Sequence, residues 1–193
     1  LGCAGPGQYL QNQGKGTFSP LALDDVSGGP NVTLLTRLFD LDSDGDLDLF
    51  ARRVAPGDAG SDRVFTSTTG HLYNNNRDQS FDDLSETLGL AFKDVSIGSV
   101  LCDDFDDDRD LDLVVFPSGS DKPIGWVNDR VWQYHLLEAD TMGLLTHHVL
   151  GATSGDPDGD GDRDLLVFTA SGVQLFINQG EFRFALDQSF SDR

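Results

Sequence analysis

The feature that most constrains this chain is a nine-residue aspartate-rich segment that occurs three times. The copies are Asp40–Asp48 (DLDSDGDLD), Asp104–Asp112 (DFDDDRDLD) and Asp156–Asp164 (DPDGDGDRD). Each copy has an aspartate at every odd position and runs directly into a short apolar segment of strand-forming residues. Carboxylates this close together repel one another and destabilise a fold unless a cation neutralises them. We therefore expect three loops that bind metal.

The acidic charge of the chain comes from one residue type. Its 193 residues include 30 Asp but only three Glu, and the net charge is −20. Aspartate favours turns and caps over helix interiors, so this charge belongs in turns. The 13 Lys and Arg are scattered, which argues against a nucleic-acid partner and against binding to an anionic membrane surface. No apolar run approaches the roughly 18 residues of a transmembrane segment.

A second kind of segment alternates with the acidic loops. It runs from an aromatic residue through asparagine and a turn to phenylalanine, and its clear copies are YLQNQGKGTF (9–18), LYNNNRDQSF (72–81) and LFINQGEFRF (175–184). A further copy is expected between residues 125 and 140. The best match there is the eroded segment VWQYHLLEAD (131–140).

The two kinds of segment divide the chain into half a unit followed by three units. The half unit covers residues 1–25, and the units cover about 31–93, 94–146 and 147–193. Repeats of this size with several short strands are typical of β-propeller blades. The sequence thus predicts an all-β chain of about three and a half blades, each with four antiparallel strands. Because so few blades leave edges open, we expect a fragment of a larger propeller.

Strand-forming segments flank the acidic loops. They are Val32–Phe39, Val95–Cys102 and His147–Ala152, and each precedes one loop. Every loop is therefore predicted to be a tight connection between two antiparallel strands. The segments Gln13–Gly16 and Asn76–Gln79 are predicted hairpin turns.

The loops fit a calcium frame. Side chains at positions 1, 3, 5 and 9 can converge on one ion, position 7 can supply its backbone carbonyl, and glycine at position 6 permits the turn. The candidate ligand residues are Asp40, Asp42, Asp44, Asp46 and Asp48; Asp104, Asp106, Asp108, Asp110 and Asp112; and Asp156, Asp158, Asp160, Asp162 and Asp164. We expect up to three structural Ca²⁺ ions, which would bring the net charge from −20 to −14.

Two points qualify this frame. Arg109 replaces the glycine of the second loop, which predicts an uncommon backbone conformation and weaker binding there. An EF-hand is excluded, because Ala51, Val115 and Val167 occupy position 12, where an EF-hand has glutamate. The plain alternative is a set of solvated acidic turns that bind nothing.

The pattern DxDxDGDxDL followed by LYxNxxxxxFxDxxxxxGL resembles the FG-GAP/VCBS repeat, the blade of integrin α-subunit-like propellers. Bacterial VCBS proteins and the cartilage-acidic-protein-like group are similar. The closest stretch here runs from Leu72 to Leu90. Departures are Arg109, the eroded segment 131–140 and the lack of a clear Phe-Gly…Gly-Ala-Pro signature. The resemblance implies a seven- or eight-bladed propeller, calcium between a blade's first two strands, and an extracytoplasmic role in adhesion or interaction.

We therefore expect a non-catalytic, calcium-stabilised scaffold that binds protein partners, as a subunit of a larger assembly at the cell surface, in the periplasm or outside the cell. The alternative is the propeller of a carbohydrate-active enzyme such as a polysaccharide lyase, or a carbohydrate-binding module. The candidate catalytic groups are His71, placed before a strand, His135, and the pair His147–His148, placed on a strand. A plain structural role is open for each. No nucleophile–base pairing stands out.

Two further segments leave alternatives open. Cys3 follows Leu1-Gly2 as in a bacterial lipoprotein signal, so it is a candidate lipid anchor; pairing with Cys102 or a plain thiol is also open. The stretch Pro117–Gln133 is interpreted as an insertion that holds both tryptophans, Trp126 and Trp132. Those rings either pack inside or form a partner-binding surface.

Overall fold

The chain is all-β throughout the part that the computed structural model describes, which is residues 9–21, 32–54, 68–90, 95, 97–130 and 132–190. The strands are β1 (Tyr9–Gly14), β2 (Thr17–Leu21), β3 (Val32–Phe39), β4 (Asp48–Val54), β5 (Thr68–Asn75), β6 (Phe81–Asp83), β7 (Ile97–Asp103), β8 (Asp112–Pro117), β9 (Ile124–Asn128), β10 (Tyr134–Glu138), β11 (Val149–Gly155), β12 (Asp164–Thr169), β13 (Gly172–Asn178) and β14 (Phe184–Leu186). Among these residues the single helix is α1 (Ala139–Met142), and no helix is long and apolar enough to cross a membrane.

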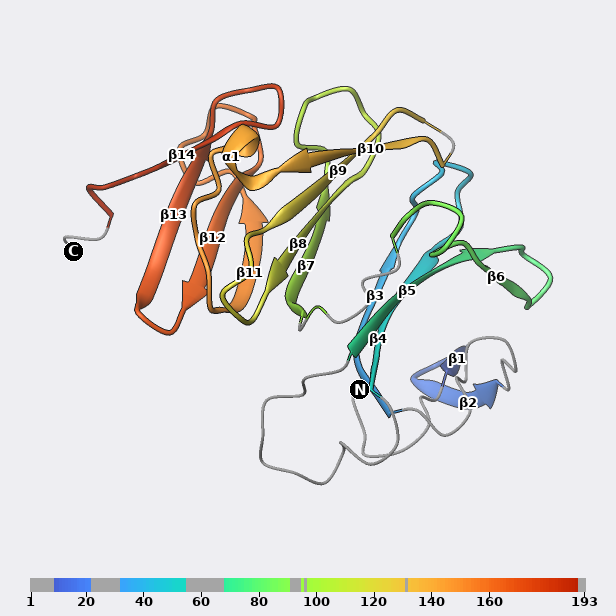
Figure 1. Ribbon diagram of the computed structural model, residues 1–193. Helices are drawn as coiled ribbons and strands as arrows, with labels where there is room; N and C mark the ends of the chain where they lie inside the picture. Colours follow the sequence, from blue (N-terminus) through green and yellow to red (C-terminus); the bar gives the residue numbers. More distant parts are fainter. Residues whose placement is uncertain are drawn as a thin grey trace. The chain divides into compact units, whose positions relative to one another are not determined.

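The strands form one two-stranded sheet and three four-stranded sheets, all antiparallel (Figure 1). In each four-stranded sheet the strands follow one another in chain order, from β3 to β6, from β7 to β10 and from β11 to β14. The predicted all-β architecture of four-stranded antiparallel sheets preceded by a half unit is confirmed. One sheet falls within each of the four predicted ranges, although the N-terminal end of the first range, including Cys3, lies outside the described residues.

The described residues fall into two compact units. The first unit extends to Phe39 and then from Gly45 to Val95, while the second contains residues 40–44 and the chain after Val95. In the first unit, the sheet β3–β6 has a core of its own, consisting of Leu49, Ala51, Tyr73 and Phe81.

In the second unit, two sheets share one hydrophobic core. Strand β11 lies against β7 and β8, so the sheets β7–β10 and β11–β14 pack together (Figure 1). Three aromatic rings mark this core, with centroids 5.1 Å apart for Phe105 and Phe182, and 5.9 Å apart for Phe182 and Phe184. Phe105 belongs to the second acidic loop, whereas its two partners belong to the turn before β14 and to β14 itself. The loop of one sheet is therefore anchored in the next sheet.

The structure corrects the prediction for the third unit. Segment 131–140 is not the missing copy, and Pro117–Gln133 is not an insertion, because Ile124–Asn128 forms the inner strand β9. The true copy runs from Trp126 to Tyr134: the amide N–H two residues after Asn128 donates to that asparagine's side chain, as it does in the other copies. Trp126 is only 5% exposed and so belongs to the core.

Candidate metal centres

The three acidic loops are hairpin connections, as predicted. The residue before each loop pairs with the ninth loop residue across two antiparallel strands, as in Phe39 with Asp48 and Asp103 with Asp112. All three loops share one backbone path with left-handed residues at positions 4 and 6: Ser43 (φ 59°), Gly45 (φ 91°), Asp107 (φ 63°), Arg109 (φ 79°), Gly159 (φ 80°) and Gly161 (φ 103°). They are therefore three copies of one binding frame.

Arg109 adopts the left-handed conformation that the glycine frame requires. Its amide N–H donates to Asp104 Oδ2 at 3.1 Å, and the Gly161 N–H makes the same bond to Asp156 at 3.2 Å. The second loop thus keeps the shape of the third, with a side chain where glycine is favoured. The predicted uncommon conformation is confirmed, while weaker binding at this loop stays a prediction.

Replacing Arg109 with glycine should relieve this conformation. We expect Arg109→Gly to raise the free energy of unfolding by about 1 kcal/mol, because its φ of 79° disfavours any side chain. The matched control Gly161→Ala should lower it by a similar amount. Urea denaturation of both variants in chelator measures the effect. A less stable Arg109→Gly protein would contradict it.

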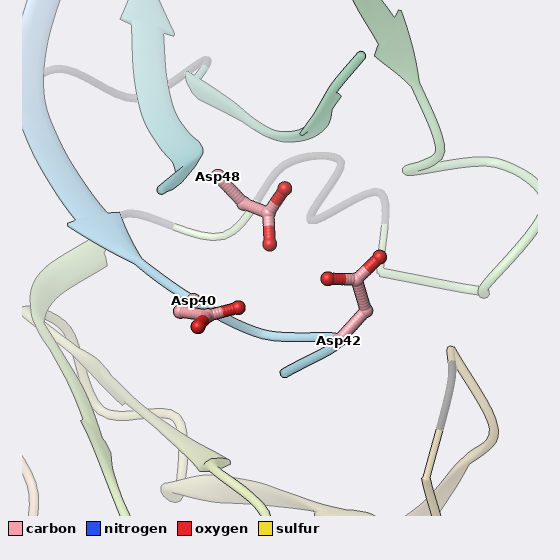
Figure 2. Close-up of side chains that lie close together, drawn as sticks. All are labelled: Asp40, Asp42 and Asp48. Carbon is pink, nitrogen blue, oxygen red and sulfur yellow. The ribbon is translucent and has the colours of Figure 1, made fainter. Parts of the chain in front are cut away.

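Each loop gathers three carboxylates. One oxygen from each of three aspartates lies within 4.8 Å of the other two: Asp40, Asp42 and Asp48; Asp104, Asp106 and Asp108; and Asp156, Asp158 and Asp164. Figure 2 shows the first set, whose carboxylates face the space between them. Positions 1 and 3 take part in every loop, position 9 in two and position 5 in one. Of the predicted side-chain ligands, Asp44, Asp112 and Asp160 stand outside these sets.

Position 9 is clamped to the third strand of its own sheet in every repeat. The backbone N–H of Asn75, Asn128 or Asn178 donates to Oδ1 of the ninth loop aspartate, at 3.0, 2.9 and 2.7 Å respectively. The same asparagine side chain donates to the carbonyl before that aspartate. These hydrogen bonds fix Oδ1 of a buried carboxylate. What Oδ2 contacts depends on the residues of the loop.

The second oxygen differs between the second and third loops. In the second loop, Asp112 Oδ2 accepts from the Phe105 N–H at 2.9 Å. In the third loop, Pro157 holds the position of Phe105 and has no N–H to give. Asp164 is 1% exposed, and its Oδ2 is buried with no hydrogen-bond partner among the residues that the structure describes. Burying a carboxylate oxygen without a partner costs folding free energy, and a bound cation would remove this cost.

Burial and mutual repulsion raise the pKa of several loop carboxyls. Burial is the main cause for Asp112, whose pKa is raised to about 7, although the N–H groups of Asn128 and Phe105 oppose the rise. Burial also raises the pKa of Asp164, with further repulsion from the other carboxylates of its loop. For Asp42, burial and the charge of Asp44 together outweigh the indole N–H of Trp132. Without a cation, Asp42, Asp112 and Asp164 therefore hold a proton more readily than an ordinary aspartate does.

The raised pKa of Asp112 predicts a pH dependence. Its folded pKa of about 7 exceeds its ordinary value of 3.8, so between these values the folded chain holds more protons than the unfolded chain. In chelator, the free energy of unfolding should therefore fall as pH rises through about 7, on the order of 4 kcal/mol in total from this group. Urea denaturation across this range measures the slope, and Asp112→Asn should flatten it. Equal slopes for the two proteins would contradict the prediction.

The side chains at position 7 face arginines in two loops. Arg77 Nε donates to Asp46 Oδ2 at 2.8 Å, and Arg130 Nε donates to Asp110 Oδ2 at 3.0 Å. Both arginines lie two residues after the clamping asparagine of their sheet. In the third repeat this place is held by Gly180, and Asp162 stands outside the carboxylate set. This arrangement agrees with a backbone role for position 7.

The donor chemistry of these sets fits calcium. All donors are carboxylate oxygens, the ligands of hard cations, and none is the imidazole or thiolate that zinc sites use. Oxygens that bind Ca²⁺ at about 2.3–2.6 Å lie no more than about 5 Å apart, which agrees with the limit of 4.8 Å here. When bound, the ion would supply charge neutralisation and a link between the two strands of the hairpin.

The histidines carry no comparable site. His71 lies within β5, not before a strand as predicted, and its ring nitrogens engage Asp83 at 2.8 Å and Thr69 at 3.0 Å. His135 Nδ1 lies 2.6 Å from Asp129. The pair His147–His148 precedes β11, so its predicted place on a strand is wrong. Among the described residues, no carboxylate set that could hold a metal includes a histidine.

Comparisons with known proteins add little to this geometry. No family model matches the chain, and no curated protein matches it. Among solved structures, a lectin from Agrocybe aegerita, described as recognising non-reducing terminal N-acetylglucosamine, is similar with 16% sequence identity and a TM-score of 0.41. The match covers 94% of this chain and spans 62% of the lectin.

Proposed function

We propose that this chain is a non-catalytic β-propeller scaffold of the FG-GAP/VCBS type, stabilised by calcium in its acidic loops. The observation that carries the proposal is Asp164, a buried carboxylate whose Oδ2 has no partner among the described residues and belongs to a set of three carboxylates. A cation at that point would satisfy the oxygen and neutralise the set. The first loop gathers the same three positions, Asp40, Asp42 and Asp48, so it is the second candidate site.

The three loops should differ in affinity. In the second loop, Asp112 already has donors on both oxygens and stands outside the carboxylate set. Arg109 adds a positive charge to the same loop. Among the described residues, the third loop has an oxygen without a donor and no arginine that contacts the side chain at position 7. We therefore expect the third loop to bind calcium more tightly than the second.

A structural calcium site indicates where such a protein works. Cytosolic calcium is too scarce to fill sites of modest affinity, whereas calcium outside the cell is plentiful. We therefore place the chain at the cell surface, in the periplasm or outside the cell, with protein partners in adhesion or assembly. The ion holds the first two strands of a sheet together and takes no part in a reaction.

Limited proteolysis tests the calcium scaffold. With calcium, cleavage within the acidic loops should slow strongly, since each ion would tie together a hairpin that otherwise contains repelling charges. Equal cleavage rates in calcium and in chelator would count against the proposal. A parallel screen for release of unsaturated products from acidic polysaccharides should show no activity, and turnover there would favour the lyase alternative instead.

A further inference from the structure

In the second unit, the turn after the third strand of a sheet contacts the preceding acidic loop. Asn178 Nδ2 donates to the Phe105 carbonyl at 2.9 Å, and the Phe182 N–H donates to the same carbonyl at 3.2 Å. One repeat earlier, Asn128 Nδ2 donates to the Leu41 carbonyl, also at 2.9 Å. Phe105 and Leu41 both occupy position 2 of their loops, and both are buried. The second residue of an acidic loop is therefore held by the next repeat.

Trp132 and Phe182 occupy the same place in this turn. Each lies four residues after the clamping asparagine, and their backbones match, with φ of 61° and 57°. Phe182 packs its ring on Phe105. Trp132 is half-buried and carries a donor, and its indole Nε1–H donates to Asp42 Oδ2 at 3.1 Å. The turn thus reaches Asp42, a carboxylate that the calcium frame places among the side-chain ligands of the preceding loop.

We propose that Trp132 is a positioning residue for calcium binding in the first loop, where it holds the Asp42 carboxylate by one oxygen. This inference deepens the proposed function, because it assumes that the first loop binds calcium. A hydrogen bond to one oxygen of a carboxylate fixes the orientation of the group, so that its second oxygen can point at the ion. Partners of this kind typically change metal affinity by about 10–100-fold.

The first and second loops differ in the side chain that faces their position 3 carboxylate. The third residue of the second loop is Asp106, and the matching turn residue there is Phe182, which has no side-chain donor. The first loop alone, among the described pairs, therefore has an indole on its position 3 carboxylate. Occupancy of the first loop should be visible in the fluorescence of Trp132, while occupancy of the other loops should not be.

The first experiment follows tryptophan emission as calcium is added to the full chain after chelation. Wild type should show a saturable change that is absent in Trp132→Phe and retained in Trp126→Phe, which removes the other indole. Comparison of wild type with Trp132→Phe isolates the signal without touching the core. Asp40→Asn, which disables the first loop, should abolish the change while calorimetry still records calcium binding elsewhere.

The second experiment measures affinity by calorimetry. Phenylalanine is tolerated at the matching place in the next repeat, so Trp132→Phe should keep the turn intact. We expect it to weaken one class of sites by about tenfold and to leave the others unchanged. If calcium binds in the first loop, as judged by Asp40→Asn, but emission stays constant and Trp132→Phe keeps full affinity, this inference is wrong. If no calcium binds at all, the proposed function fails with it.

Discussion

Calcium should raise the melting temperature of the chelator-stripped chain by about 10–20 °C. At a free concentration of about 100 times the dissociation constant, each site adds about 2.7 kcal/mol to the free energy of unfolding. Two such sites, the first and third loops, add about 5 kcal/mol, and a chain of this size gains roughly 2–4 °C for each kcal/mol. Differential scanning calorimetry in calcium and in chelator measures the shift.

Magnesium is the matched control for this shift. It demands near-ideal octahedral geometry and gives up its water reluctantly, so these irregular loops should respond to it weakly. A shift of equal size with magnesium would indicate simple charge screening. A melting temperature that stays the same with calcium would contradict the proposal that calcium stabilises this scaffold.

Asp164→Asn should have opposite effects with and without calcium. Without calcium, asparagine relieves a buried charge whose second oxygen has no partner, and its amide can donate to Asp156 or Asp158. We expect a gain in the free energy of unfolding of about 1 kcal/mol. With calcium, the variant loses the third site and the roughly 2.7 kcal/mol that the ion adds there, so its free energy of unfolding should be about 1.7 kcal/mol below that of wild type. Urea denaturation in the two conditions measures both effects.

Two matched variants separate the charge from the hydrogen bonds. Asp112→Asn should stabilise the calcium-free chain less than Asp164→Asn does, because its amide would meet the Phe105 N–H, a second donor. Asp162→Asn changes a carboxylate of the third loop that stands outside the set, so it should leave calcium binding nearly intact. If Asp164→Asn lowered stability equally in calcium and in chelator, the third loop would have no special need for a cation.

The sequence is enough to predict most of the strands and all three acidic loops, because both patterns are local. Strand β3 has the predicted bounds, and the loops are the predicted hairpin connections. Arg109 takes the left-handed conformation that its place in the frame requires. Aspartates at alternate positions of a tight loop point to a common centre whatever the rest of the chain does, which is why positions 1 and 3 meet in every copy.

The missed third copy has a specific cause. The predicted segment ends in phenylalanine, whereas this repeat has Trp126 before its asparagine and Tyr134 at its end. The spacing that would have found it is an asparagine followed six residues later by an aromatic, as in Asn75 with Phe81 and Asn178 with Phe184. An asparagine with fixed hydrogen bonds is a better marker of the turn than the identity of the ring.

Other features of the site depend on tertiary contacts. Arg77 and Arg130 lie 31 and 20 residues from the aspartates they contact, so no local pattern joins them. Asp164 Oδ2 lacks a donor because Pro157 has no N–H. This cause is visible only by comparison with the second loop, where the Phe105 N–H donates to Asp112 Oδ2. Trp132 reaches Asp42 across 90 residues of chain. These contacts join residues that are far apart along the chain, so no local sequence pattern predicts them.

Equilibrium dialysis with radiolabelled calcium tests the central claim, that these loops bind calcium. The full chain should take up calcium saturably, with at least the first and third loops filled. Asp164→Asn should bind one ion fewer, and Asp162→Asn should bind as many as wild type. A chain that binds no calcium above a protein of equal net charge, or whose uptake does not change with Asp164→Asn, would contradict the account.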